Sequence, residues 1–222
     1  MRALPAQSHA RYPLNALLGS AGNLRLLRAL CTSPAARSVS QLAEATGLTA
    51  QGVRNVLGGL LAIGIASVAG AGRSQVYSAN RGHPLFALVR PLFEAERSRW
   101  NSLREGLRKA LARRPAVHSA WYYGSTARGV DGPGSDFDVT IVVKGAGVDR
   151  TLALVRKDLR SLEEAFGLTF SVIGLSMADL ARHAASTPAS SWWQSMTKDA
   201  QMLKGDRPEH LAAGKATREG AA

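Results

Sequence analysis

Two aspartates spaced one residue apart, Asp136 and Asp138, open the apolar run DFDVTIVV at residues 136–143. Side chains alternate along a β-strand, so residues i and i+2 share one face and the two carboxylates lie side by side. Two such carboxylates repel each other, and a hard divalent cation is the usual compensation, most often Mg²⁺ in phosphoryl chemistry. The pair therefore predicts a Mg²⁺ (or Mn²⁺) site, with Asp136 and Asp138 as metal ligands and catalytic residues.

Two small residues precede the aspartates. The β-prone segment from Val117 to Tyr123 leads directly into Gly124 and Ser125, and a glycine-rich loop follows. Glycine lets a phosphate approach the backbone, and serine offers its hydroxyl and its amide to phosphate oxygens. Arg128 either neutralises a phosphate or lies on the surface, and its residue type favours neither. The sequence thus predicts a nucleotide-binding loop with Gly124, Ser125 and Arg128 as candidate contacts.

The spacing of these residues matches a known pattern. Gly124 and Ser125, ten further residues, and then Asp136-Phe137-Asp138 resemble the signature of the polymerase β nucleotidyltransferase superfamily, in particular its minimal nucleotidyltransferases. The resemblance covers residues 116–205 and implies an α/β (α+β) fold with a small mixed sheet. It also implies a nucleoside triphosphate at Gly124 and Ser125 and Mg²⁺ at the aspartates. Minimal nucleotidyltransferases that act as antitoxins pair with a toxin, so a protein acceptor or a toxin is a candidate partner.

The sequence departs from this family in one respect. Active members generally have a third carboxylate on a later strand, where it binds metal and activates the attacking hydroxyl. The expected place falls near Ser171, but no acid lies between Leu168 and Ser176. Asp179 begins the next helix and is interpreted as a partner of its N-terminal dipole. Serine is neither an anionic ligand nor a carboxylate base at neutral pH, so catalytic activity stays open.

The remaining aromatic residues of this half have structural interpretations. A helix is predicted over residues 190–203, and its Trp192 and Trp193 are assigned to a core or an interface. Stacking of one tryptophan on a base is the alternative. His118 is interpreted as packed or exposed rather than catalytic. Residues 206–222 are predicted to form a loose tail.

The charge of the chain is concentrated in its N-terminal half. Residues 1–115 hold 16 Lys and Arg against 4 Asp and Glu, whereas residues 116–222 hold 12 of each class. Such an asymmetry indicates two domains, the first of which meets a polyanion. A basic surface that is merely solvated is the alternative.

The basic half contains the pattern of two short helices joined by a turn. Ser40 is expected to cap a first helix, and Gly47 is expected to end it and supply the turn. Thr49 is expected to cap a second helix over residues 50–64, with apolar residues at helical spacing on one face. Those residues are Val53, Val56, Leu57, Leu60 and Leu61. The arrangement predicts a helix-turn-helix, preceded by a helix that begins near Leu14.

After Gly64 the sequence IASVAGAGRSQVYSAN predicts a strand, a glycine-rich turn and a second strand, with Arg73 at the tip. Residues 13–82 therefore resemble the winged helix-turn-helix of bacterial and archaeal regulators. In that motif the second helix enters the DNA major groove, so Gln51, Arg54 and Asn55 become candidate DNA contacts together with Arg73. A winged helix that binds protein rather than DNA is the alternative, and a homodimer is left open.

Residues 83–115 predict a connecting helix after Pro91, because apolar residues recur at helical spacing. The candidate buried positions are Leu92, Phe93, Leu103, Leu107 and Leu111.

Composition limits the class of protein. A chain of 222 residues with 45% hydrophobic content is sufficient for two small domains with cores. The single cysteine, Cys31, excludes an intramolecular disulfide framework and is expected to be a buried thiol. No apolar run approaches the length of a membrane span, and the N-terminus lacks the hydrophobic region of a signal peptide, so a cytoplasmic location is expected.

Two functions follow as hypotheses. The first is Mg²⁺-dependent transfer of a nucleotidyl group, AMP from ATP, to a hydroxyl on a protein or small molecule. The second is a DNA-binding transcriptional regulator whose degenerate transferase domain senses nucleotide or mediates contacts. The two hypotheses are compatible, since a fused enzyme could regulate its own gene.

Overall fold

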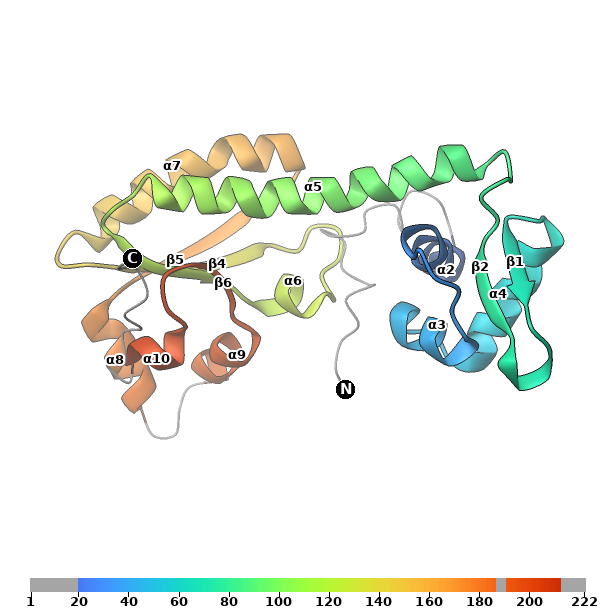
Figure 1. Ribbon diagram of the computed structural model, residues 1–222. Coiled ribbons are helices and arrows are strands. Elements are labelled where there is room, and N and C mark those ends of the chain that lie inside the picture. Colours follow the sequence, from blue (N-terminus) through green and yellow to red (C-terminus); the bar gives the residue numbers. More distant parts are fainter. Residues whose placement is uncertain (1–19, 187–190, 213–222) are drawn as a thin grey trace, which may run out of the picture. The chain divides into compact units, whose positions relative to one another are not determined.

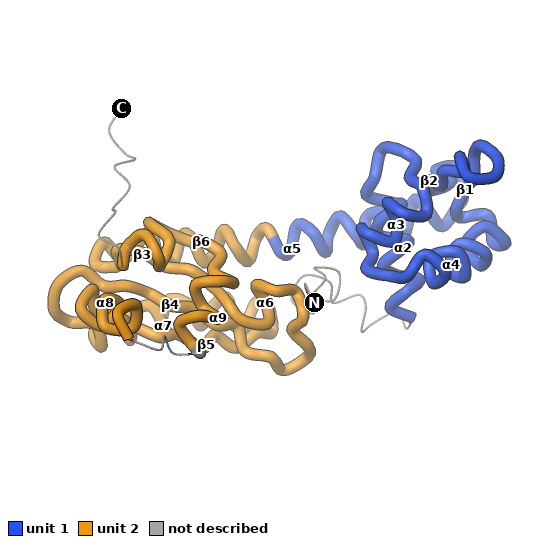
Figure 2. The backbone as a smooth tube through the Cα atoms, turned by 90° about the horizontal axis from the view of Figure 1, so that it is seen from below, with its two compact units in different colours: residues 1–100 blue, residues 101–222 orange. Residues whose placement is uncertain are grey.

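The computed structural model describes residues 20–186 and 191–212. The chain divides into two compact units, residues 1–100 and 101–222 (Figure 2). Helix α5 (Phe86–Ala112) begins in the first unit and ends in the second. Within the described part of the chain, none of the helices combines the length and the apolar content that crossing a membrane requires.

Between residues 20 and 85, the first unit forms three helices followed by a two-stranded antiparallel hairpin (Figure 1). The elements are α2 (Ala21–Thr32), α3 (Val39–Thr46), α4 (Ala50–Ala62), β1 (Ala66–Ala69), the 3₁₀ turn η2 (Gly72–Ser74) and β2 (Val76–Ala79). The two helices, the turn and the hairpin predicted from the sequence are thus formed. Their assignment to a winged helix-turn-helix that binds DNA stays a prediction. The expected start of the first helix near Leu14 lies outside the described residues.

The helix ends follow from capping residues, with one correction. Ser38, not Ser40, caps α3: its hydroxyl accepts from the amide of Gln41, whose side chain bonds back to the amide of Ser38. This reciprocal capping box begins the helix two residues earlier than expected. Gly47 ends α3 at φ 70°, and the Thr49 hydroxyl accepts from the amide of Gly52 at 3.0 Å, as predicted.

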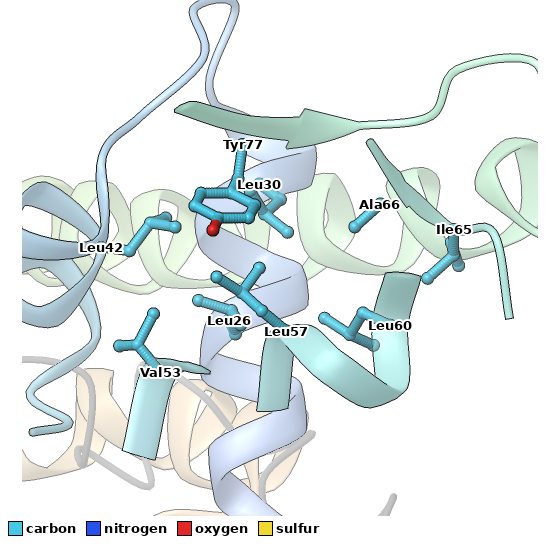
Figure 3. Close-up of a cluster of buried hydrophobic side chains, with 9 residues drawn as sticks. All are labelled: Leu26, Leu30, Leu42, Val53, Leu57, Leu60, Ile65, Ala66 and Tyr77. Atoms are coloured by element: carbon cyan, nitrogen blue, oxygen red, sulfur yellow. The ribbon is translucent and has the colours of Figure 1, made fainter. Parts of the chain in front are cut away.

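The main core of the first unit joins helices α2, α3 and α4 to both strands of the hairpin, as Figure 3 shows. Its buried members are Leu26, Leu30, Leu42, Val53, Leu57, Leu60, Ile65, Ala66 and Tyr77. Three of the five predicted positions on α4 are therefore fully buried, while Val56 and Leu61 are only half-buried. Because this stripe faces inward, the opposite side of α4 remains available to solvent.

Helix α5 begins before Pro91 rather than after it. Proline is the sixth residue of the helix, within its first two turns. Phe93 is buried with Leu24 and Cys31, as expected, but Leu92 is 45% exposed and its predicted burial was wrong. Successive helical residues point about 100° apart, so Leu92 lies off the face that Phe93 buries. Burial raises the pKa of the Cys31 thiol to about 11, which agrees with an inert core thiol.

The second unit contains a four-stranded mixed sheet with the order β5-β4-β3-β6. Its elements are β3 (Val117–Tyr122), α6 (Gly124–Arg128), β4 (Phe137–Val143), α7 (Val148–Phe166), β5 (Phe170–Ser176), α8 (Met177–Ala185), α9 (Ser191–Asp199), β6 (Gln201–Lys204) and α10 (Pro208–Ala212). Strands β4 and β5 are parallel and are joined by α7, whereas β3 pairs antiparallel with β4 and β6. The small mixed sheet expected from the sequence is confirmed.

Both faces of this sheet are covered by helices (Figure 1). One face presents Trp121, Val142 and Leu175 to buried residues of α8, α9 and α10, among them Leu180 and Met196. On the other face α7 packs on β5, where a Cβ on Gly174 would lie 2.9 Å from the Val148 side chain. Asp138 and Val142 occupy the same face of β4, because side chains two and four positions apart point the same way.

Two predicted boundaries in the second unit were wrong. The helix expected over residues 190–203 ends at Asp199, and residues 201–204 form strand β6 instead. Strand β6 pairs with the edge of β3, whose backbone groups would lack these partners if residues 201–204 continued the helix. Residues 208–212 of the expected tail form helix α10, whose Leu211 is buried. The rest of that tail, residues 213–222, lies outside the described residues.

Candidate active site

The two aspartates lie where β4 begins. Asp136 is exposed just before the strand, and Asp138 is half-buried as its second residue. Burial raises the pKa of the Asp138 carboxyl, the negative charge of Asp136 raises it further, and Arg128 opposes both effects. The structure therefore brings the predicted pair together, and its electrostatics are those that a bound cation would relieve.

Gly124 lies directly against the Asp138 carboxylate. The amide of Tyr123 donates to the Asp138 carbonyl at 3.2 Å, which holds the end of β3 beside the start of β4. Gly124 follows with φ +75°, and a Cβ added there would lie 2.6 Å from Asp138 Oδ2. The sequence suggested space for a phosphate at this glycine. The structure gives a further reason for it, because a larger residue would displace the carboxylate.

Ser125 belongs to a short helix rather than to the expected loop. Helix α6 begins at Gly124, and Gly129 ends it with φ 75°. The Ser125 carbonyl accepts from the amide of Val130 at 3.0 Å, and the Ser125 side chain is half-buried. Ser125 therefore lies in the first turn of α6, directly after the glycine that lies against Asp138.

Arg128 is both exposed and paired. Its guanidinium donates to the Asp199 carboxylate at the end of α9, with 2.5 Å between Nη1 and Oδ2. The Asp199 side chain is only 9% exposed, whereas that of Arg128 is 43% exposed. Because Arg128 also lowers the pKa of Asp138, it lies within electrostatic reach of the aspartates.

No third carboxylate occupies the neighbouring strand. In the parallel β4–β5 pair, Ser171 is the direct register partner of Asp138, and paired residues share one face of the sheet. The position expected from the sequence is therefore adjacent to Asp138, and it holds a half-buried serine.

Asp179 lies in the first turn of α8, where the sequence placed it as a partner of the helix dipole. Its carboxylate accepts from the Ser176 amide and hydroxyl in a capping box that begins α8. These bonds lower the pKa of Asp179, and Arg182 also pairs with it. This carboxylate is engaged at the start of α8 rather than in the candidate site.

Two buried side chains that lie close in sequence to the site residues were not singled out from the sequence. Asp131, in the loop between α6 and β4, is 5% exposed. Tyr123, immediately before Gly124, is buried against the indole of Trp192. The glycine-rich loop masked the first, because such loops are expected at the surface. For Tyr123 the sequence predicts only the end of an apolar strand.

The carboxylates of the candidate site fit a cation that is also bound by the phosphates of a nucleotide. Asp136 and Asp138 supply carboxylate oxygens, and no group of three or more His, Cys, Asp or Glu that could hold a metal occurs among residues 20–186 and 191–212. Mg²⁺ commonly binds through one or two carboxylates, with the remaining positions filled by substrate phosphates and water. The residues therefore fit Mg²⁺ bound to a nucleotide rather than a metal site built entirely of protein.

The candidate DNA contacts are exposed in the first unit. Gln51, Arg54 and Asn55 lie on the outer side of α4, where the Gln51 amide donates to Asn55 Oδ1 at 2.9 Å. Arg73 is exposed in η2, between the strands of the hairpin. The structure thus presents three of these residues from one helix and the fourth from the turn.

Replacing Gly124 by alanine is expected to weaken Mg²⁺·ATP binding at least about tenfold, because the new methyl group would displace the Asp138 carboxylate. Gly134→Ala is the matched control: its φ is +82°, but no atom lies within 4 Å of its added Cβ. Both variants bear a backbone cost of about 1–2 kcal/mol. Calorimetric affinities that fell equally in both would show that backbone strain, not the contact with Asp138, governs the site.

Part of the chain is similar to known proteins. Residues 104–173 match the family model of the nucleotidyltransferase domain. A comparison with curated proteins gave no match. The crystal structure of a mutant of the toxin-antitoxin MntA-HpeT is 16% identical, with a TM-score of 0.37, and the match covers 50% of this chain and 82% of that one. The crystal structure of a toxin-antitoxin with AMP-PNP is 17% identical, with a TM-score of 0.36 and the same coverages. The matched residues include both aspartates, so the second unit contains a region similar to the nucleotidyltransferase domain.

Proposed function

We propose that this protein catalyses Mg²⁺-dependent transfer of a nucleotidyl group, AMP from ATP, to a hydroxyl acceptor. One observation supports this most strongly: Asp138 lies beside Asp136 and against Gly124, where burial and then the charge of Asp136 raise its pKa. A protein retains such a repulsive pair at a functional site more readily than in a structural role.

The residues have separable tasks in this proposal. Asp136 and Asp138 would hold the metal, and Ser125 would bond phosphate oxygens through its hydroxyl and amide. Bound Mg²⁺ would supply charge neutralisation for in-line attack on the α-phosphorus. Arg128 would add positive charge near the phosphates while it stays anchored by Asp199. Because Ser171 replaces a carboxylate base, the acceptor hydroxyl would be activated weakly.

The proposal is tested by incubating the protein with labelled ATP, Mg²⁺ and cell extract. Label should pass to a protein or a small molecule with the wild-type chain and not with Asp136→Ala/Asp138→Ala. Transfer of equal extent with both proteins, or no transfer from any nucleotide, would count against the activity. A labelled protein band would identify a protein partner, which the proposal allows.

A second candidate function is a DNA-binding regulator with a degenerate transferase domain that senses nucleotide. Two observations favour it: the serine at the register position beside Asp138, and the exposed polar residues of α4. The positive charge of the first 115 residues supports binding to a polyanion. This candidate and the first are compatible in one chain.

Arg54→Ala is expected to weaken DNA binding roughly tenfold and to reduce the slope of log affinity against log salt by about one. The arginine is exposed on α4, so its loss should leave the core intact. Arg54→Lys keeps the charge and should restore the salt slope, though not any bidentate base contact. Fluorescence anisotropy with random and genomic DNA measures both quantities. An unchanged affinity in Arg54→Ala would remove this helix from the DNA interface.

A further inference from the structure

Three aromatic rings gather beside the candidate active site. They come from three elements: Tyr123 follows β3, Trp192 lies in α9, and His183 lies in α8. The Trp192 indole donates to the Tyr123 hydroxyl at 3.1 Å and meets its ring edge-on, with centroids 6.3 Å apart. The centroid of His183 lies 5.0 Å from that of Trp192. The nucleotidyl-transfer proposal assigns no task to these rings.

Tyr123 joins this aromatic group to the aspartates. Its amide bonds to the Asp138 carbonyl, and the next residue is the glycine that contacts the Asp138 carboxylate. Tyr123 and Asp138 therefore lie opposite each other where strands β3 and β4 pair.

The two adjacent tryptophans differ in their surroundings. Trp193 is 8% exposed and belongs to the core that includes Trp121 and Met196. Trp192 is half-buried, and so is His183. The bond from Trp192 to Tyr123 fixes the orientation of an indole that retains accessible surface. An aromatic ring fixed in this way loses little conformational entropy when a flat ligand stacks on it.

We propose that Trp192, oriented by Tyr123 and flanked by His183, stacks the base of the nucleotide whose phosphates bind at Gly124, Asp136 and Asp138. This inference rests on the proposed function, since it assigns a subsite of the same ligand. Every nucleobase has a π-face, so stacking alone tolerates different bases. Stacking on Trp192 therefore adds affinity for a nucleoside but discriminates little among nucleosides.

The test compares Mg²⁺·ATP with Mg²⁺·tripolyphosphate, which has phosphates but no base. Calorimetric affinities are measured for the wild-type chain, Trp192→Leu and Trp192→Phe. Leucine retains apolar volume and removes the π-face, so it should weaken ATP binding about tenfold and leave tripolyphosphate binding unchanged. Phenylalanine keeps a ring without the indole N–H and should restore most of the ATP affinity.

Three outcomes overturn the inference in distinguishable ways. ATP affinity in Trp192→Leu equal to that of the wild type would show that the ring does not contact the base. An equal loss for both ligands would show that Trp192 acts through Tyr123 on the aspartates instead. If neither ligand binds the wild-type protein, the proposed function fails together with its subsite. Unchanged tripolyphosphate binding also demonstrates that the variant is folded.

Discussion

Asp138→Asn is expected to abolish Mg²⁺-dependent nucleotide binding and, at neutral pH, to raise the melting temperature of the ligand-free protein. Burial and the charge of Asp136 raise the pKa of Asp138 in the folded state above its unfolded value. The Asp138 carboxyl therefore loses its proton at a lower pH in the unfolded chain than in the folded chain. Above the unfolded pKa, the carboxylate charge lowers the free energy of unfolding. Asparagine removes the charge and the cost together, but it also removes a metal ligand.

The raised pKa of Asp138 also sets how the stability gain in Asp138→Asn depends on pH. The stability difference between Asp138→Asn and the wild type should be largest above the folded pKa of Asp138. It should shrink as the pH falls through that pKa, because the wild-type carboxyl then becomes neutral as well. Asp158→Asn is the matched control of opposite sign, since hydrogen bonds from Arg114 lower the pKa of Asp158. That variant should lose stability at neutral pH.

Thermal unfolding with and without Mg²⁺·ATP measures both parts of this prediction. A ligand at one hundred times its Kd stabilises the wild-type protein by about 2.7 kcal/mol, and Asp138→Asn should show no such shift. Any transfer activity should fall at least about 10³-fold, because metal stabilisation of the transition state is worth several kcal/mol. A variant that retained the ligand-induced shift would remove Asp138 from the metal site.

Ser171→Asp is expected to increase the rate of nucleotidyl transfer about 10²- to 10⁴-fold, the usual range for general-base assistance. Ser171 is the register partner of Asp138 on the adjacent parallel strand, so the new carboxylate would lie beside the existing pair. Three close acids should also lower the stability of the metal-free protein, and Mg²⁺ should restore part of it.

Ser171→Asn is the matched control, because it has the size of aspartate without the charge. Label transfer from ATP is compared for both variants at saturating Mg²⁺. A rate that rises only with aspartate would show that the serine limits an otherwise competent site. Equal rates in the two variants, with nucleotide still bound, would show that a carboxylate at this position does not restore transfer, and the domain would then be a nucleotide-binding module.

The part of the site that the sequence predicts is the part set by local geometry. Alternation along a strand places Asp136 and Asp138 on one face whatever the rest of the fold does. The caps at Gly47 and Thr49 are local in the same sense, since each depends on a few neighbouring residues. Ser38 and Ser40 could each cap α3 by residue type, and the structure has Ser38 as the cap because Gln41, three residues later, completes the capping box.

The remaining features depend on contacts between distant segments. Gly124 lies so close to the Asp138 carboxylate that an added Cβ would be 2.6 Å from Oδ2, and this closeness depends on the pairing of β3 with β4, which no local pattern specifies. The ion pair of Arg128 with Asp199 likewise joins residues of α6 and α9. Strand β6 was predicted as helix because its residues continue the helical pattern of α9, whereas pairing with β3 decides their conformation.

The central claim is that the aspartate pair binds a nucleoside triphosphate through Mg²⁺, and calorimetry tests it most directly. ATP is titrated into the wild-type protein and into Asp136→Ala/Asp138→Ala, each with and without Mg²⁺, at one salt concentration. We expect binding only in the wild-type protein with Mg²⁺ present. Binding that persists in the double variant, or that does not require Mg²⁺, would contradict the proposed site.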